Sequence, residues 1–77
     1  MVRAYVFLET NVGSGPAVAD TLRSLPAVRL VYRVTGPHDV IATVETRDMA
    51  ALSQLVEGKI GGVPGIDRTI TCIVMPR

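Results

Sequence analysis

The chain has 77 residues, one histidine, one cysteine and a formal net charge of +1. A chain of this length folds as one domain and buries only about 60–65% of the surface that its unfolded form exposes. One cysteine cannot form an internal disulfide, and one cysteine with one histidine cannot complete a structural zinc site. We therefore predict a single domain over residues 1–77, with no metal ion or cofactor, that gains stability from oligomerisation.

The basic residues are scattered along the chain, whereas surfaces that bind nucleic acid usually gather them into one patch. No direct binding to nucleic acid is therefore expected. The apolar start MVRAYVFLET lacks the layout of a signal peptide and is too short to span a membrane. We expect a cytoplasmic protein with no membrane association, and the low cysteine content fits a reducing compartment.

The first two elements are a strand and a helix. The segment Val2 to Thr10 is rich in β-branched, aromatic and aliphatic residues, and it runs into the loop-like sequence NVGSGP, so we predict a strand there. A helix follows, capped by Ser14 and ended by Pro26, with apolar residues at every third or fourth position.

Two further β-branched runs, Val28 to Thr35 and Val40 to Thr46, are separated by four residues, a connection of hairpin length. Gly36 and Pro37 suit a tight turn, because glycine is conformationally free and proline favours the second position of a turn. The sequence therefore predicts an antiparallel hairpin.

A second helix is expected after Asp48, its N-cap, with apolar residues at every fourth position from Leu52 to Ile60 and its end at Gly61. The segment Ile66 to Met75 is predicted as the last strand. The resulting order βαββαβ is that of the ferredoxin-like α+β fold. This fold has a four-stranded antiparallel sheet with both helices on one face, and it occurs in proteins of the dimeric α+β barrel type.

Alternation along the first strand predicts that both faces of the sheet are apolar. One face carries Ala4, Val6 and Leu8, and the other carries Tyr5 and Phe7. Two helices can cover only one face, so the other needs a second layer. The simplest second layer is another copy of the chain, and we predict at least a homodimer.

The hairpin sequence VTGPHDV places the only histidine beside a carboxylate. It is open to three interpretations, namely a plain turn, a ligand-binding loop, and a catalytic or metal-binding pair. Adjacent residues of an extended segment point to opposite sides, so His38 and Asp39 are poorly placed to act as a dyad. The residues alone favour the turn, with the ligand loop second.

Three residues of the last strand also bear on function. Thr69 and Thr71 lie two positions apart and share a face of the strand, so their hydroxyls could bind a polar ligand, although threonine is common in strands. Cys72 has no basic neighbour in sequence and is expected to be a buried, unreactive thiol.

The loop NVGSGP, which precedes the first helix, lacks the spacing of phosphate-binding loops and is interpreted as a turn.

Two motifs carry a family resemblance. They are V-x-x-V-Y-x-V-T-G-x-x-D from Val28 to Asp39 and P-G-[IV]-x-x-T-x-T from Pro64 to Thr71. In this order around the second helix, they resemble the effector-binding (RAM) domain of the Lrp/AsnC feast/famine transcription regulators. Such regulators normally carry a preceding helix-turn-helix domain, so the chain resembles a stand-alone RAM protein. His38 stands where the family often has an aromatic residue, which puts the usual ligand preference in doubt.

The resemblance implies a non-enzymatic amino-acid sensor and oligomerisation module that modulates transcription together with full-length Lrp/AsnC regulators. It implies sheet-to-sheet homodimers that assemble further, as an octamer or decamer, with the amino acid bound between dimers. The ligand would contact Gly36, His38 and Asp39 of the hairpin, with Thr69 and Thr71 nearby. Backbone N–H groups of the hairpin would hold the α-carboxylate, and Asp39 would pair with the α-ammonium group.

Two alternatives stay open. One is a small enzyme of the dimeric α+β barrel kind, such as a monooxygenase, for which the polar candidates are His38, Tyr5 and Tyr32. The sequence shows no convergent acid, base and nucleophile, so no catalytic residue is predicted. The other alternative is an assembly module without a ligand. His38 also suggests that binding or assembly changes around pH 6–7, since an ordinary histidine titrates at about pH 6.5.

Overall fold

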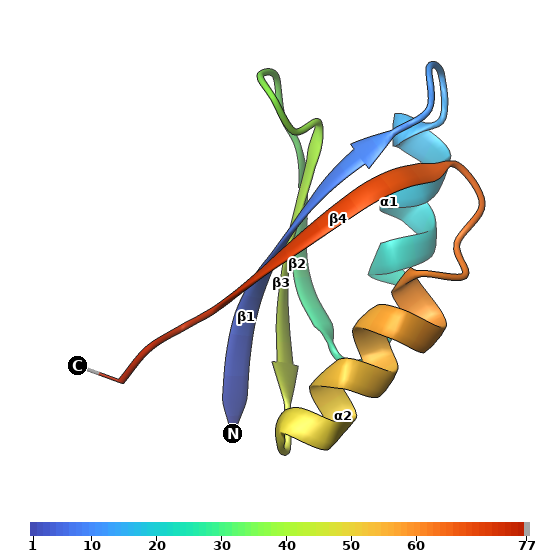
Figure 1. Cartoon of the computed structure of the whole chain (residues 1–77). Helices are drawn as coiled ribbons and strands as arrows, with labels where there is room; N and C mark the ends of the chain where they lie inside the picture. The colour runs from blue at the N-terminus through green and yellow to red at the C-terminus, as the bar shows by residue number, and fades with distance from the viewer. Residues whose placement is uncertain (77) are drawn as a thin grey trace.

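The computed structural model describes residues 1–76, and in these residues the chain has the predicted βαββαβ order (Figure 1). The elements are β1 (Val2–Thr10), α1 (Gly15–Arg23), β2 (Val28–Arg33), β3 (Val40–Thr46), α2 (Met49–Ser53), η1 (Gln54–Ile60) and β4 (Ile66–Ile73). The bounds of β1 and β3 are those predicted. Within the same residues, no helix combines the length and apolar character needed to cross a membrane.

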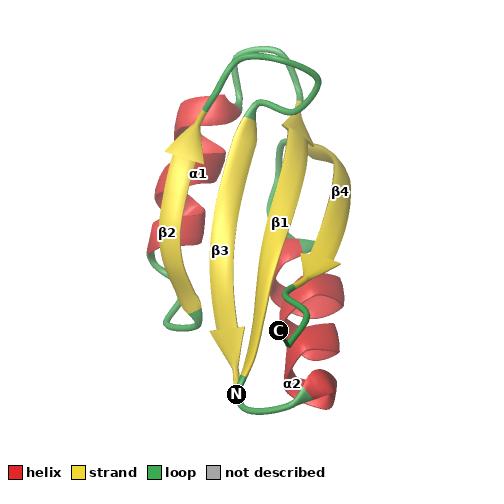
Figure 2. Ribbon diagram, turned by 90° about the vertical axis from the view of Figure 1, so that its left-hand side faces the viewer, coloured by secondary structure: helices red, strands yellow, loops and turns green. Residues whose placement is uncertain are grey.

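The strands pair in the order β2-β3-β1-β4, and each pair is antiparallel. α1 and the continuous helical segment α2–η1 lie on one face of the sheet, as Figure 2 shows from the opposite side. This arrangement confirms the ferredoxin-like fold. The side chains buried between the sheet and the helices come from every element except β4: they are Ala4, Val6, Leu8, Val18, Ala19, Leu22, Val28, Val31, Val40, Ala42, Val44, Leu52, Leu55 and Ile60, together with Val63 of the following loop.

The second helix begins where the sequence predicts but changes its winding. The Asp48 side chain accepts a hydrogen bond from the Ala51 N–H (2.8 Å), as expected of an N-cap. From Gln54 onward the helix is a π-helix, and its wider turn brings Leu55 and Ile60, five residues apart, to the core. The predicted apolar stripe still faces the core, with Val56 partly buried, but this half winds as a π-helix instead of the predicted α-helix.

The hairpin loop is longer than predicted. β2 ends at Arg33, two residues before the expected Thr35, and the Val34 N–H donates to the Asp39 carbonyl (2.9 Å) across the loop. Gly36 has φ +121°, a conformation that L-residues with a side chain rarely adopt, which explains the glycine. The last strand likewise ends early, at Ile73 instead of Met75.

The sheet face turned away from the helices, which faces the viewer in Figure 2, is apolar, as alternation in β1 predicts. We call it the open face. It consists of two rows of residues that cross the strands in register, Leu30-Thr43-Tyr5-Cys72 and Tyr32-Ile41-Phe7-Ile70. Tyr5 of the inner strand β1 and Tyr32 of the edge strand β2 are 47% and 52% exposed, which is high for large aromatic side chains.

Charged side chains border both ends of the open face. At one end, the Glu45 carboxylate lies 3.3 Å from Arg3 Nε and 3.5 Å from Arg29 Nη2. At the other end, Glu9 lies opposite Arg68 of β4 and close to His38. An apolar centre with a charged rim is the usual composition of a protein interface.

Candidate ligand-binding cleft

An open cleft of about 970 Å³ lies at one edge of the sheet, lined by residues of the β1–α1 loop and of the β2–β3 hairpin. Both of these loops lie at the same end of the molecule (Figure 1). β1 and β2 run in the same direction, because each is antiparallel to β3, so both strands end at this edge. The residues that give the cleft its polar character are Thr10, Asn11, Arg33, Thr35 and Asp39.

Asp39 ties the two walls of the cleft together. Its Oδ1 accepts a hydrogen bond from the Thr10 N–H (2.9 Å), and its Oδ2 accepts one from the Thr10 hydroxyl. The Thr10 hydroxyl is the main reason why the pKa of Asp39 is lowered, with the Thr10 N–H and the charge of Arg33 adding to the effect against the opposing cost of burial. Asp39 is therefore an ionised carboxylate at neutral pH.

Arg33 brings a positive charge into the same cleft. A Cβ atom added at Gly15 would lie 3.6 Å from Arg33 Nε and 3.7 Å from both Asp39 Oδ2 and Thr10 Oγ1. These groups therefore surround the first residue of α1, and the absence of a side chain at Gly15 keeps the space between them open. The cleft thus offers a carboxylate and a guanidinium group close together.

Three of these residues were missed in the sequence analysis, and the topology explains why. Thr10 ends β1, Arg33 ends β2 and Gly15 begins α1, so only the strand order places them together. Had the edge at which β1 and β2 end been examined, it would have pointed to Thr10 and Arg33. The hairpin motif by itself indicated only Asp39.

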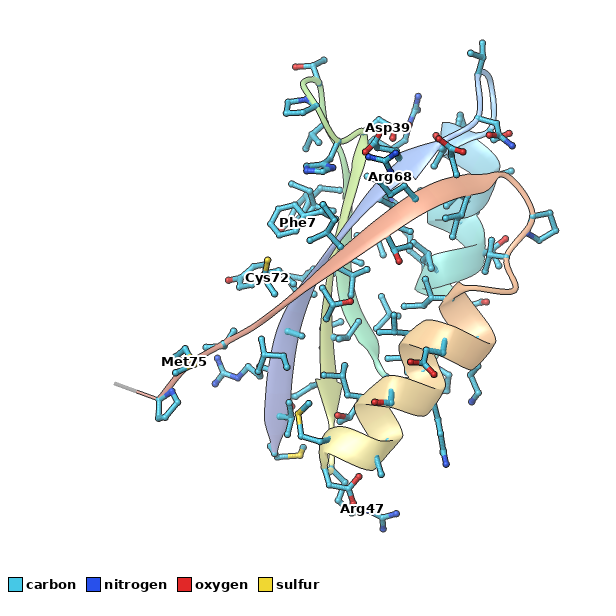
Figure 3. All side chains as sticks on the ribbon, in the orientation of Figure 1. Phe7, Asp39, Arg47, Arg68, Cys72 and Met75 are labelled. Carbon is cyan, nitrogen blue, oxygen red and sulfur yellow. The ribbon has the colours of Figure 1, made fainter. Side chains whose placement is uncertain are left out.

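His38 lies on the other side of the sheet. Its ring packs against Phe7 of the open face, with centroids 5.4 Å apart, and its Nδ1 lies 3.9 Å from Glu9 Oε2. Figure 3 shows the Phe7 side chain pointing away from the helices. The side chains of His38 and Asp39 therefore diverge, as expected for neighbours in an extended segment, and they form no dyad.

The five predicted site residues do not meet in one pocket of this chain. Asp39 lines the cleft, whereas Gly36 lies in the hairpin above it and His38 faces the open side. Thr69 pairs with Leu8 and shares its helix-facing side, and Thr71 lines a separate groove of about 220 Å³ beside α2. This register is consistent with the prediction that the two threonines share a strand face, and neither of them lines the cleft that contains Asp39.

Cys72 corrects another expectation. It is exposed on the open face, opposite Tyr5, and not buried (Figure 3). Cys72 lies on the side of β4 opposite Thr69 and Thr71, and in the single chain no second layer covers that side of the sheet. In residues 1–76, His, Cys, Asp and Glu side chains form no group of three or more able to hold a metal ion.

Comparison with known proteins supports the family resemblance. The family described as the Lrp/AsnC ligand binding domain matches residues 3–77. The HTH-type transcriptional regulator FL11 of Pyrococcus horikoshii is 29% identical over 72 residues, covering 94% of this chain and 47% of FL11. The chain therefore spans about half the length of that regulator.

Two other proteins are similar to this chain. The homocitrate synthase of Sulfurisphaera tokodaii is 33% identical over 69 residues, which are 90% of this chain but 15% of that protein. The crystal structure of TTHA0845 from Thermus thermophilus superposes with a TM-score of 0.95 at 31% identity, covering 100% of this chain and 96% of the other. Because the family model matches nearly the whole length of this chain, and the chain shares its fold with TTHA0845, this chain belongs to the Lrp/AsnC ligand-binding domain family.

Proposed function

We propose that this domain is a non-enzymatic sensor of a small zwitterion, with an α-amino acid as the ligand class. The observation that carries the proposal is the cleft in which ionised Asp39 and the Arg33 guanidinium lie close together. An amino acid carries the complementary pair of charges. Its ammonium group would bind Asp39 and its carboxylate would bind Arg33, both through charge-assisted hydrogen bonds.

Asp39 can serve the ligand and the fold at once. A carboxylate offers about four acceptor positions, and Thr10 fills two of them. The Asp39 N–H already donates to the Leu8 carbonyl (3.0 Å), so the hairpin donors proposed for the ligand carboxylate are the N–H groups of Gly36 and His38. Thr69 and Thr71 keep a role in this proposal only where a neighbouring chain brings them to the cleft.

Assembly is the second part of the proposal. The open face would pack against the open face of a second copy, because leaving its two apolar rows in water costs free energy. These homodimers would join into larger rings, an octamer or decamer, with the cleft near the contacts between dimers. Full-length Lrp/AsnC regulators share this domain and are the proposed partners in mixed assemblies.

Sensing fits the chain better than catalysis. In the cleft, Asp39 is hydrogen-bonded to Thr10 and feels the charge of Arg33. The candidate acid–base groups His38, Tyr5 and Tyr32 belong instead to the open face. The same domain also matches part of a protein named as an enzyme and part of one named as a transcription regulator. A module shared by such different proteins is more readily explained as a ligand sensor than as the catalytic unit.

Calorimetric titration of the purified chain with each common amino acid tests the proposal. We expect at least one to bind, and the variants Asp39→Asn and Arg33→Gln each to weaken binding tenfold or more, since each removes a charge-assisted contact worth about 1.5–3 kcal/mol. Gly15→Leu should also abolish binding, because its side chain would fill the space between Arg33, Asp39 and Thr10.

Matched controls separate the cleft from general effects of charge. Asp20→Asn removes a carboxylate of α1 outside the cleft, and Arg47→Gln removes a cation from the opposite end of the molecule (Figure 3). Both should bind like the wild type. If no amino acid binds, or if the Asp39 and Arg33 variants bind as well as these controls, the proposed site is wrong and a ligand-free assembly module becomes the better interpretation.

A further inference from the structure

His38 and Asp39 hold two consecutive residues of β1 from opposite sides of the sheet. Asp39 binds Thr10 on the helix side, and His38 approaches Glu9 on the open-face side. The hairpin that forms one wall of the cleft is therefore joined to the end of β1 by two contacts of different chemistry. Asp39 forms hydrogen bonds with Thr10, whereas His38 forms none with Glu9.

The His38 contact lacks a hydrogen bond. Its Nδ1 has less than 1 Å² of exposed surface and no hydrogen-bond partner among the described residues. The nearest carboxylate oxygen, Glu9 Oε2, is 3.9 Å away, which is too far for a hydrogen bond. A buried polar atom without a partner is unfavourable, so a small movement that joins the two groups would be stabilising once Nδ1 carries a proton.

Two opposite charges lie near His38. Glu9 of β1 is the anionic group that faces the ring and favours its protonation. The cationic Arg68 of β4 lies opposite Glu9 and opposes it, but forms no ion pair with Glu9 among the described residues. From β2, Tyr32 lies on the same face of the sheet. Asp39 is directed to the helix side, where Thr10 holds its carboxylate. A proton gained by His38 would therefore be shared with Glu9.

We infer that protonation of His38 closes its contact with Glu9 and fastens the hairpin to β1, which makes the hairpin wall of the cleft proton-sensitive. Histidines change charge at about pH 6.5, where carboxylates stay ionised. The Asp39–Thr10 contact persists over this range because the pKa of Asp39 is lowered. The contact between His38 and Glu9 is inferred from their positions in the structure. Only its effect on ligand affinity rests on the proposed function.

Amide hydrogen exchange without ligand tests the fastening directly. The Val34 N–H, bonded to the Asp39 carbonyl, and the Asp39 N–H, bonded to Leu8, report on the hairpin. The Glu45 N–H, bonded to Ala27 at the other end of β3, is the internal reference. After correction for intrinsic rates, the two hairpin amides should gain about two- to fivefold protection over the reference from pH 7.5 to 5.5, the effect of a partly exposed ion pair.

Two variants identify the groups involved. His38→Phe keeps an aromatic ring against Phe7 but cannot take up the proton, and Glu9→Gln removes the charge while keeping the shape. The gain in protection should disappear in both, and Glu9→Gln alone suffices if His38→Phe does not fold. The inference is overturned if the wild type shows no gain, or if either folded variant retains it.

Ligand binding then separates this inference from the proposed function. Any amino acid that binds should bind more tightly at pH 5.5 than at pH 7.5 in the wild type, with no such change in Glu9→Gln. A pH-dependent hairpin in a protein that binds no amino acid would leave the fastening intact and overturn the proposed function. Binding that is insensitive to pH would overturn the coupling between them.

Discussion

The carboxylate of Asp39 accepts hydrogen bonds from both the backbone N–H and the hydroxyl of Thr10, 29 residues earlier in the chain. This pair joins the end of β1 to the end of the β2–β3 hairpin across the cleft. One residue of the hairpin motif therefore has a structural task, whether or not it also binds a ligand.

Thr10→Val should destabilise the protein, because valine keeps the shape of threonine but cannot donate to Asp39. We expect a loss of about 1 kcal/mol in the free energy of unfolding, the usual net contribution of one hydrogen bond. Urea unfolding followed by circular dichroism measures it. Thr21→Val is the control, since the Thr21 hydroxyl bonds an exposed carbonyl within α1 and its loss should matter little. Equal effects of the two changes would contradict the assignment.

Stability should fall on acidification in a way that depends on Asp39. Its pKa in the folded state lies below the ordinary value of 3.8, chiefly because the Thr10 hydroxyl donates to it, so the unfolded chain takes up the proton first. The stabilisation is complete above the unfolded pKa and is lost as the pH falls through the folded pKa. Urea midpoints from pH 6 to pH 2 should therefore decline more steeply in the wild type than in Asp39→Asn. Parallel curves would count against this account.

Two glycines should respond in opposite ways to alanine. Gly65 has φ +94°, and a Cβ there would lie 2.8 Å from the Ser14 Cβ, so Gly65→Ala should cost about 1–3 kcal/mol. Gly58 lies in η1 with open space around it, so Gly58→Ala should stabilise by about 0.5–1 kcal/mol. Thermal unfolding of both variants measures the difference. A neutral Gly65→Ala would mean that the approach of its loop to α1 is not close in solution.

The secondary structure could be predicted further than the site. β1 and β3 have the predicted bounds because β-branched and aromatic residues fill both strands up to clear turn signals. The change to a π-helix after Ser53 had no such signal, since Leu55, Val56 and Ile60 also fit an α-helical stripe. Periodicity reports which side chains are apolar, and packing against the sheet decides how the helix winds to bury them.

The cleft depends on strand order, which local patterns do not contain. The hairpin motif indicated Asp39, but Thr10 and Arg33 reach it only because β1 and β2 end at the same edge of the sheet. Thr69 and Thr71 were grouped with the hairpin from family likeness, yet within one chain they lie on the helix side of β4. In the proposed assembly, a neighbouring chain would have to bring Thr69 and Thr71 to the cleft.

The proposed dimer can be tested within the apolar rows of the open face. Tyr32→Lys places a charge in one of the two apolar rows, and burying an unpaired charge in an interface is strongly unfavourable. Sedimentation velocity should show dimers or larger species for the wild type and monomers for this variant. Thr21→Lys is the control, because Thr21 is exposed on α1, away from both the open face and the cleft. Assembly that survives Tyr32→Lys would place the interface elsewhere.

Cys72 offers an independent probe of the same face without any added charge. Its thiol is exposed in the single chain, beside Tyr5 in the open face, so a second copy packed there would cover it. Labelling by an aromatic disulfide reagent should therefore be slow at high protein concentration and faster on dilution, as the dimer dissociates. Tyr32→Lys should label rapidly at every concentration. A wild-type labelling rate that is rapid and independent of concentration would show that the open face stays uncovered, and the apolar rows would then need another partner.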